Sequence, residues 1–178
     1  MSEFENRVKN AIRNVPDFPK KGIVFKDVST LFQDASLCAE LLKRMEADAK
    51  LLQPDVIVGI DSRGFVLGAT LAFAMGIPFV MARKKGKLPY DKISESYELE
   101  YGFDELEMHI DAVQKNQRVL IHDDLLATGG TAECVAKLIN QLGGKVVGFS
   151  FIVNLKFLEG GEKLKKYSSN LFAAAAYV

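Results

Sequence analysis

Two adjacent carboxylates and a loop of small residues lie next to each other in the second half of the chain. Asp123 and Asp124 end a short apolar run, and the loop after them contains Ala127, Thr128, Gly129, Gly130 and Thr131. A helical pattern starts at this loop. The free N–H groups and the dipole of a helix N-terminus favour an anion, glycines let it approach the backbone, and threonines add hydroxyl donors.

The two carboxylates suit a different part of the same ligand. Asp123 and Asp124 repel a phosphate, but carboxylates accept hydrogen bonds from sugar hydroxyls. A phosphate site beside two carboxylates describes a ribose 5-phosphate. P-loop hydrolysis and Rossmann dinucleotide binding lack sequence support, because Gly144-Lys145 precedes Val146 and no Gly-x-Gly-x-x-Gly follows a strand.

Two further segments carry charges that suit an anionic ligand. Asp61, Ser62 and Arg63 follow an apolar run, and Arg63 could clamp an anion or simply be a surface charge at a helix start. A second segment, 83–87, carries the cations Arg83, Lys84, Lys85 and Lys87. Such a run is usually a solvated loop, but beside an anion site it would form a lid that binds the anionic ligand.

A serine hydrolase is an alternative interpretation of the 60–64 segment. Ile60-Asp61-Ser62-Arg63-Gly64 is one residue short of the Gly-x-Ser-x-Gly nucleophile elbow, with Asp and His residues downstream. Gly is missing at position 60, and 178 residues are few for that fold. The Ser62→Ala variant would separate the two interpretations.

The elements that must position these residues follow from periodicity and from Gly and Pro punctuation. Helices are expected over 3–14, 36–52, 64–75 and 130–142. Strands are expected over 56–60, 79–81, from Val119, over 146–153 and over 171–178, with an antiparallel hairpin around Gly102. Residues 16–22 are expected to be irregular, and residues 83–95 a mobile loop.

Strands that alternate with helices predict an α/β fold with a mostly parallel sheet flanked by helices. Ligands bind such sheets beyond the C-terminal ends of the strands. The loops after strands 56–60 and 79–81 and after the Val119 strand should therefore line one crevice.

Composition narrows the class of protein. The 178 residues favour a single domain, 1–178. Because Lys plus Arg and Asp plus Glu both number 23, charge gives no case for a nucleic acid or membrane partner. Cys38 and Cys134 lack metal spacing and are typical of a reduced, cytoplasmic protein. His122 is expected to be a core histidine within a strand. A transition metal held by the protein is not expected.

The run 119–131 closely resembles the 5-phosphoribosyl 1-diphosphate (PRPP) signature of the type I phosphoribosyltransferases. Segments 22–27, 61–65 and 94–102 resemble the adenine phosphoribosyltransferases of that family. The resemblance covers residues 16 to 155 and implies the type I fold, with a small hood and a flexible hairpin loop. It also implies transfer of phosphoribose from PRPP to adenine, giving AMP and diphosphate in purine salvage. A regulator on the same fold that senses PRPP without turnover is the other hypothesis.

The resemblance also implies roles for individual residues. Asp123 and Asp124 would hold the ribose hydroxyls, and 127–131 the 5-phosphate. The diphosphate would meet Asp61, Ser62, Arg63 and the cations Arg83, Lys84 and Lys87. Phe25 and Leu125 would sandwich the purine, with backbone near Val24 and Lys26 reading its edge, and Glu100 would be the catalytic acid/base residue.

Two positions bear on the choice of base. Relatives that act on 6-oxopurines carry an acidic residue where this chain has Ala127, which favours adenine. The adenine enzymes often have Arg where this chain has Lys26. The resemblance further implies Mg²⁺ carried by PRPP rather than held directly by the protein, and a homodimer in which Arg83 could reach the neighbouring site.

Overall fold

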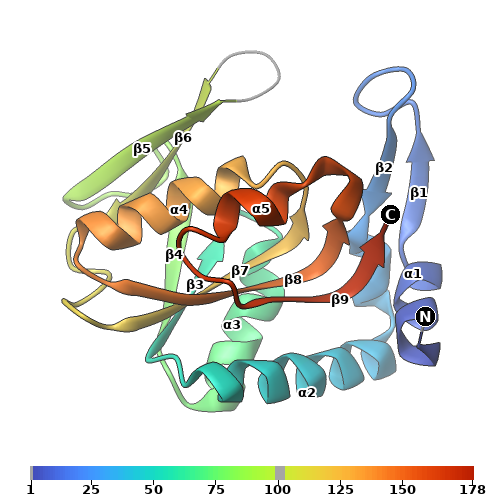
Figure 1. Cartoon of the computed structure of the whole chain (residues 1–178), viewed down its shortest axis with the longest axis horizontal. Helices are drawn as coiled ribbons and strands as arrows, with labels where there is room; N and C mark the ends of the chain where they lie inside the picture. Colours follow the sequence, from blue (N-terminus) through green and yellow to red (C-terminus); the bar gives the residue numbers. More distant parts are fainter. Residues whose placement is uncertain (1, 99–102) are drawn as a thin grey trace.

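The computed structural model describes residues 2–98 and 103–178, and its main feature is a seven-stranded sheet in the order β5-β6-β4-β3-β7-β8-β9 (Figure 1). The parallel strands are β3 (Val56–Ile60), β4 (Phe79–Lys84), β7 (Arg118–Leu126), β8 (Lys145–Leu155) and β9 (Leu171–Tyr177). The hairpin of β5 (Lys92–Glu98) and β6 (Phe103–His109) joins antiparallel at β4. The prediction of a mostly parallel α/β sheet is therefore confirmed.

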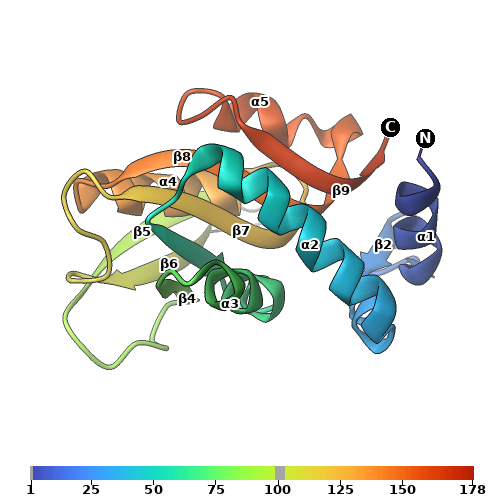
Figure 2. The same cartoon turned by 90° about the horizontal axis from the view of Figure 1, so that it is seen from below.

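Helices cover both faces of the sheet (Figure 2). On one face α2 (Ala35–Leu52) and α3 (Gly64–Met75) pack in a core that includes Ile57 and Leu120. On the other face α4 (Gly130–Gln141) and the short α5 (Gly160–Leu164) pack in a core that includes Val58 and Ile121. Neighbouring residues of one strand point to opposite faces, which is why the central strands are continuously apolar.

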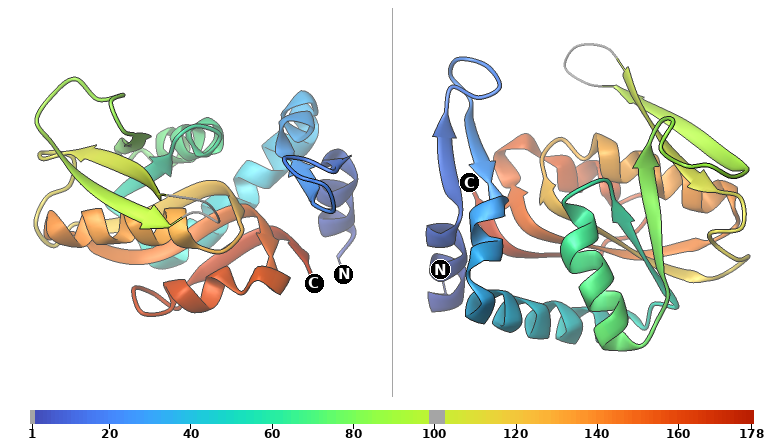
Figure 3. Two further views of the ribbon diagram at one scale, coloured as in Figure 1. Left: turned by 90° about the horizontal axis from the view of Figure 1, so that it is seen from above. Right: turned by 180° about the vertical axis from the view of Figure 1, so that it is seen from behind.

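An N-terminal unit, the hood, lies at the β9 edge of the sheet. It comprises α1 (Glu3–Ala11), the paired strands β1 (Arg13–Pro16) and β2 (Val24–Asp27), and the 3₁₀ helix η1 (Val28–Gln33). Phe4 and Val8 of α1 share a core with the sheet, and the Glu5 carboxylate accepts a hydrogen bond from the Ala176 N–H (3.1 Å). The β1–β2 and β5–β6 hairpins rise on either side of the same edge of the molecule (Figures 1 and 3).

Two predicted boundaries in the hood were wrong. The first helix ends at Ala11 rather than at residue 14, and the irregular segment expected from residue 16 starts only after the strand Arg13–Pro16, which pairs with Val24–Asp27. β1 and β2 are short, partly exposed and flanked by Pro and Gly, so they carry no period-2 alternation by which a sequence pattern could reveal them.

The predicted bounds of the 83–95 loop were also wrong at both ends. Arg83 and Lys84 belong to β4 and pair with β6, and residues 92–95 belong to β5. The hairpin itself is confirmed, although Gly102 lies outside the described residues. The strand starting near Val119 continues through Leu126, because its pairing with β8 extends to Asn154.

None of the described helices is both long and apolar enough to cross a membrane.

Candidate active site

The loop between β7 and α4 has the geometry that the sequence predicted for a phosphate cradle. Gly129 adopts a left-handed φ of 79° and caps α4, which begins at Gly130. A non-glycine residue is strained at that φ. The loop borders a small cavity of about 70 Å³ lined by residues 125–132 together with Asp123 and Phe151. The first N–H groups of α4 lie at this end, so the loop can receive an anion.

A second cavity, of about 300 Å³, opens beside the first and shares Asp123 and Thr131 with it. We refer to it as the central cavity. Its lining residues come from four segments of the chain: Asp61, Ser62, Arg63, Lys84, Tyr97, Asp123, Asp124 and Thr131. The three loops expected to share one crevice therefore do so, at the C-terminal ends of their strands.

The two predicted ribose ligands lie at the floor of this cavity. Asp124 is buried and Asp123 is half-buried within β7, and the Asp124 N–H donates to Asp123 Oδ1 (2.8 Å). Burial raises the pKa of the Asp123 carboxyl well above its usual value, and the charge of Asp124 raises it further. Arg63 pairs with Asp124 through Nε and Oδ2, which partly compensates this concentration of negative charge.

The predicted diphosphate cations also pair with carboxylates. Arg83 Nε lies 3.2 Å from Asp61 Oδ2, and Lys84 Nζ lies 3.3 Å from Asp104 Oδ2. Arg83 additionally donates to the carbonyl of Lys87 (3.2 Å), which is how the turn after β4 is held, while the Lys87 side chain itself is exposed. Arg63 and Lys84 reach the central cavity, and Arg83 borders it through Asp61.

Tyr97 is a site residue that the sequence reasoning missed. Its hydroxyl donates to Asp104 Oδ2 (3.1 Å), and its side chain lines the central cavity together with Thr131 of the phosphate loop. Burial raises the pKa of Tyr97 to about 12, so the phenol is neutral and can donate. The signal was present in the alternation of residues 97–101, but that alternation predicts a strand and does not say which loop the strand faces.

The predicted base-binding residues come from the hood and from β7. Val24 and Phe25 are on β2, and the Arg63 guanidinium lies over the Phe25 ring at 5.5 Å from its centroid. The hood therefore reaches the mouth of the central cavity. Lys26 turns away from Arg63, because its Nζ donates to Asn14 Oδ1 (2.6 Å) and lies 4.4 Å from the Tyr177 ring centroid. Leu125, on β7, packs partly buried in the core.

His122 is a core histidine, as expected. It is fully buried, its Nδ1 lies 3.3 Å from Ser150 Oγ, and burial lowers its pKa to about 4. In the described part of the chain neither histidine hydrogen-bonds Ser62, so the serine hydrolase alternative lacks its catalytic base.

Cys134 is buried and donates to the Glu95 carbonyl, consistent with a packing role. The predicted acid/base residue Glu100 lies outside the described residues.

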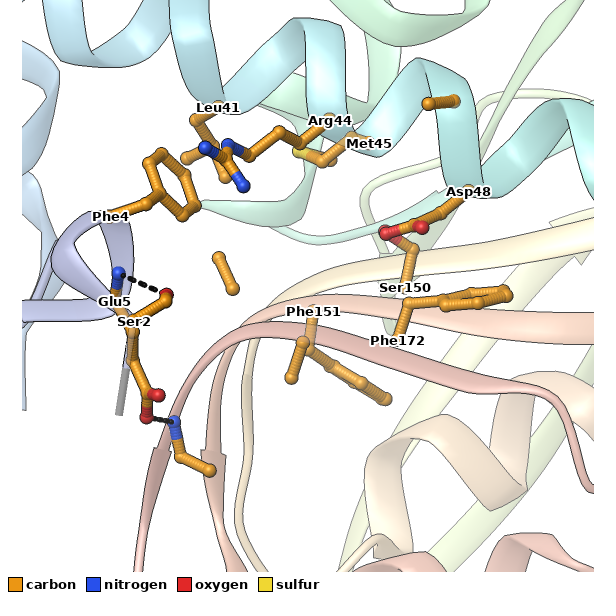
Figure 4. Close-up of a pocket in the computed structure, with 14 residues that line it drawn as sticks. Ser2, Phe4, Glu5, Leu41, Arg44, Met45, Asp48, Ser150, Phe151 and Phe172 are labelled. Carbon is orange, nitrogen blue, oxygen red and sulfur yellow. Dashed lines mark hydrogen bonds between the residues drawn. The ribbon is translucent and has the colours of Figure 1, made fainter.

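A larger cavity, of about 410 Å³, lies away from these residues, between α1, α2 and the strands β8 and β9 (Figure 4). Phe4, Arg44 and Asp48 are among the side chains around it. It contains none of the residues predicted to bind substrate, so its size alone does not identify the functional site.

Comparison with known proteins agrees with this geometry. Residues 29–172 match the family model of the phosphoribosyl transferase domain. The adenine phosphoribosyltransferase of Natranaerobius thermophilus is 52% identical over 161 residues, covering 90% of this chain and 94% of the relative. The crystal structure of adenine phosphoribosyltransferase from Thermoanaerobacter pseudethanolicus superposes with a TM-score of 0.92 at 44% identity, covering 97% of this chain and 99% of that one.

A third similar protein carries ligands in its crystal structure. Adenine phosphoribosyltransferase from Saccharomyces cerevisiae, complexed with an imino-altritol bisphosphate and adenine, has a TM-score of 0.88 at 35% identity. The match covers 98% of this chain and 99% of the yeast chain.

Proposed function

This chain belongs to the phosphoribosyl transferase domain family, and we propose that it transfers the 5-phosphoribosyl group of PRPP to adenine, giving AMP and diphosphate. One observation carries the proposal. Asp123 lines both the cavity of the phosphate loop and the central cavity, and Asp124, Arg63 and Lys84 line the central cavity with it. PRPP has the same order of groups, with a 5-phosphate, ribose hydroxyls and a 1-diphosphate.

In this arrangement Asp123 and Asp124 accept hydrogen bonds from the ribose hydroxyls, and residues 127–131 bind the 5-phosphate. The diphosphate is bound by the 61–63 loop and by the cations of β4 and its turn, Arg83, Lys84 and Lys87. Phe25 and Leu125 enclose the base, and backbone groups near Val24 and Lys26 read its edge. The position of the Lys26 side chain, paired with Asn14, supports a backbone role for this residue.

The reaction forms a bond between adenine N9 and ribose C1 and breaks the bond from C1 to the diphosphate oxygen, which leaves with the electron pair. Positive charge develops on the ribose, and the fixed cations Arg63 and Lys84 stabilise the departing anion. Adenine attacks through the N9 lone pair of its N7-H tautomer, and Glu100 accepts the N7 proton as the acid/base residue. The hairpin that carries Glu100 excludes water, which would otherwise hydrolyse PRPP.

Magnesium is proposed to arrive bound to PRPP. Among the described residues no group of three or more His, Cys, Asp and Glu is arranged to hold a metal ion, and Asp61 and Asp124 already pair with arginines. Substrate oxygens and water, the usual ligands of Mg²⁺ at phosphate sites, would therefore bind it. When bound, the ion supplies charge neutralisation of the diphosphate.

A homodimer is proposed from the apolar surface of α3 and β4. Val66, Phe73 and Met81 are exposed on these two elements, and exposed apolar surface of this kind marks an interaction site. Sedimentation of the wild type as a dimer and of Phe73→Glu as a monomer is expected; a monomeric wild type would refute this part of the proposal.

Residues 1–178 are proposed to form one domain, because the hood shares a core with the sheet. A cytoplasmic location is proposed on the basis of two unpaired thiols, which suit a reducing compartment.

The test is a base panel with PRPP and Mg²⁺, in which adenine, hypoxanthine, guanine and uracil are compared for nucleotide formation. Adenine should react faster than hypoxanthine by orders of magnitude, because Ala127 stands where 6-oxopurine enzymes carry an acidic residue. Comparable rates would refute the assignment of the base. PRPP binding without product from any base would instead favour the regulator.

A further inference from the structure

The phosphate loop has a second backbone behind it, that of the first residue of α5. A Cβ atom built on Gly160 would collide with the Ala127 carbonyl oxygen and would lie 2.8 Å from Gly129 N and 2.9 Å from Thr128 C. In the reverse direction, a Cβ atom on Gly129 would lie 2.6 Å from the Gly160 carbonyl oxygen. The two glycines therefore bring two main chains into direct contact.

The requirement at Gly160 is steric rather than conformational. Its φ is not among the positive values of the chain, in contrast to the 79° of Gly129, so alanine would be tolerated by its backbone. The atoms that a methyl group would meet are all main-chain atoms of the phosphate loop. A side chain can rotate away from a new methyl group, whereas a backbone segment can only be displaced.

The α5 side of the contact is fixed by its own packing. Leu164 is fully buried in the core shared with α4, and Lys166 Nζ forms an ion pair with Glu133 Oε1 of α4 (2.5 Å). α4 in turn begins at the phosphate loop. Extra volume at position 160 would therefore move the loop, which borders a cavity, more readily than the packed α5.

We propose that Gly160 is a positioning residue for substrate binding: its missing side chain lets α5 hold residues 127–129 where their backbone receives the 5-phosphate of PRPP and AMP. This inference rests on the proposed function of the loop. It predicts a defect specific to ligands with a 5-phosphate, because Gly160 does not line the central cavity where the ribose and the base side are bound.

The experiment compares Gly160→Ala with Gly161→Ala in the full chain. Gly161 is the matched control, since a Cβ atom there meets only Leu171 Cδ1 at an ordinary 3.4 Å. Gly160→Ala should weaken AMP binding and raise the KM for PRPP by roughly tenfold or more, the loss expected when a hydrogen bond to a charged group is disturbed. The KM for adenine should stay within about twofold, and Gly161→Ala should match the wild type in all three.

An AMP affinity of Gly160→Ala within about twofold of the wild type would overturn the inference, as would equal losses for PRPP and adenine. If Gly160→Ala does not fold, hydrogen exchange of the wild type provides the test. Saturating AMP should slow exchange in 159–162 together with 127–131, and unchanged exchange in 159–162 would overturn the inference. A wild type that binds neither AMP nor PRPP would refute the proposed function instead.

Discussion

Arg63 and Asp124, 61 positions apart in the sequence, form a hydrogen-bonded ion pair across the central cavity. The side chain of Asp124 is 6% exposed and that of Arg63 is 43% exposed, so the pair joins the cavity floor to its mouth. In the proposed function the guanidinium binds the diphosphate and the carboxylate binds the ribose, so substrate binding would replace this pair with two new sets of contacts.

Arg63→Ala should weaken PRPP binding more than AMP binding, because AMP lacks the diphosphate. Hydrogen bonds to charged groups contribute about 1.5–3 kcal/mol, so the affinity for PRPP should fall by roughly 10- to 100-fold. Isothermal titration with both ligands measures the difference. Arg44→Ala, which removes a guanidinium paired with Glu40 on α2, is the control. Equal losses for PRPP and AMP would contradict a diphosphate role.

Asp123→Asn should stabilise the fold near neutral pH while weakening AMP binding. Burial and the charge of Asp124 raise the pKa of Asp123, so the folded state holds a proton that the unfolded state releases. The contribution of Asp123 to stability is therefore greatest at low pH and is lost as pH rises from the ordinary value of 3.8 through the raised pKa. Replacement of Asp123 by Asn removes this pH-dependent loss of stability. Thermal unfolding from pH 4 to pH 8 should give a flatter profile for the variant, with Asp91→Asn matching the wild type.

His122 should make the fold acid-labile over a different range. Burial lowers its pKa from 6.5 to about 4, so the folded state keeps the ring neutral where the unfolded state binds a proton. Stability is present above about pH 6.5 and is lost as pH falls toward 4, by up to about 3 kcal/mol.

Urea unfolding of His122→Val between pH 4.5 and pH 7.5 checks this dependence. The slope of stability against pH separates titration from the constant cost of repacking. The variant should show a shallower slope than the wild type, and His109→Gln should keep the wild-type slope. A wild-type slope in His122→Val would contradict the prediction.

Glu100→Gln should lower turnover with adenine by about 10²–10⁴-fold, the usual contribution of an acid/base residue. PRPP binding should change little, because Glu100 is assigned to the base. Steady-state rates and PRPP titration separate the two effects. Glu105→Gln, on the same hairpin and paired with Lys85, is the control for charge loss. A wild-type turnover number for Glu100→Gln would remove it from the mechanism.

Local patterns in the sequence predicted the elements that position the site. The strand over 56–60, the helix over 64–75 and the start of α4 at Gly130 appear with the predicted bounds. The strand is a continuous apolar run, and the helix is bounded by Gly64 at its start and by Gly76 and Pro78 after its end, so each is marked within a short window. The phosphate loop was predictable for the same reason, because its glycines, threonines and helix start are consecutive in the chain.

Contacts between distant segments were decided only by the tertiary structure. The pairing of Arg63 with Asp124, the ion pair of Arg83 with Asp61, and the contact of Gly160 with the phosphate loop each join separate segments. Periodicity states which face of an element is buried, but not which other element covers it. The path of the chain through the sheet, with β7 placed between β3 and β8, brings these residues together.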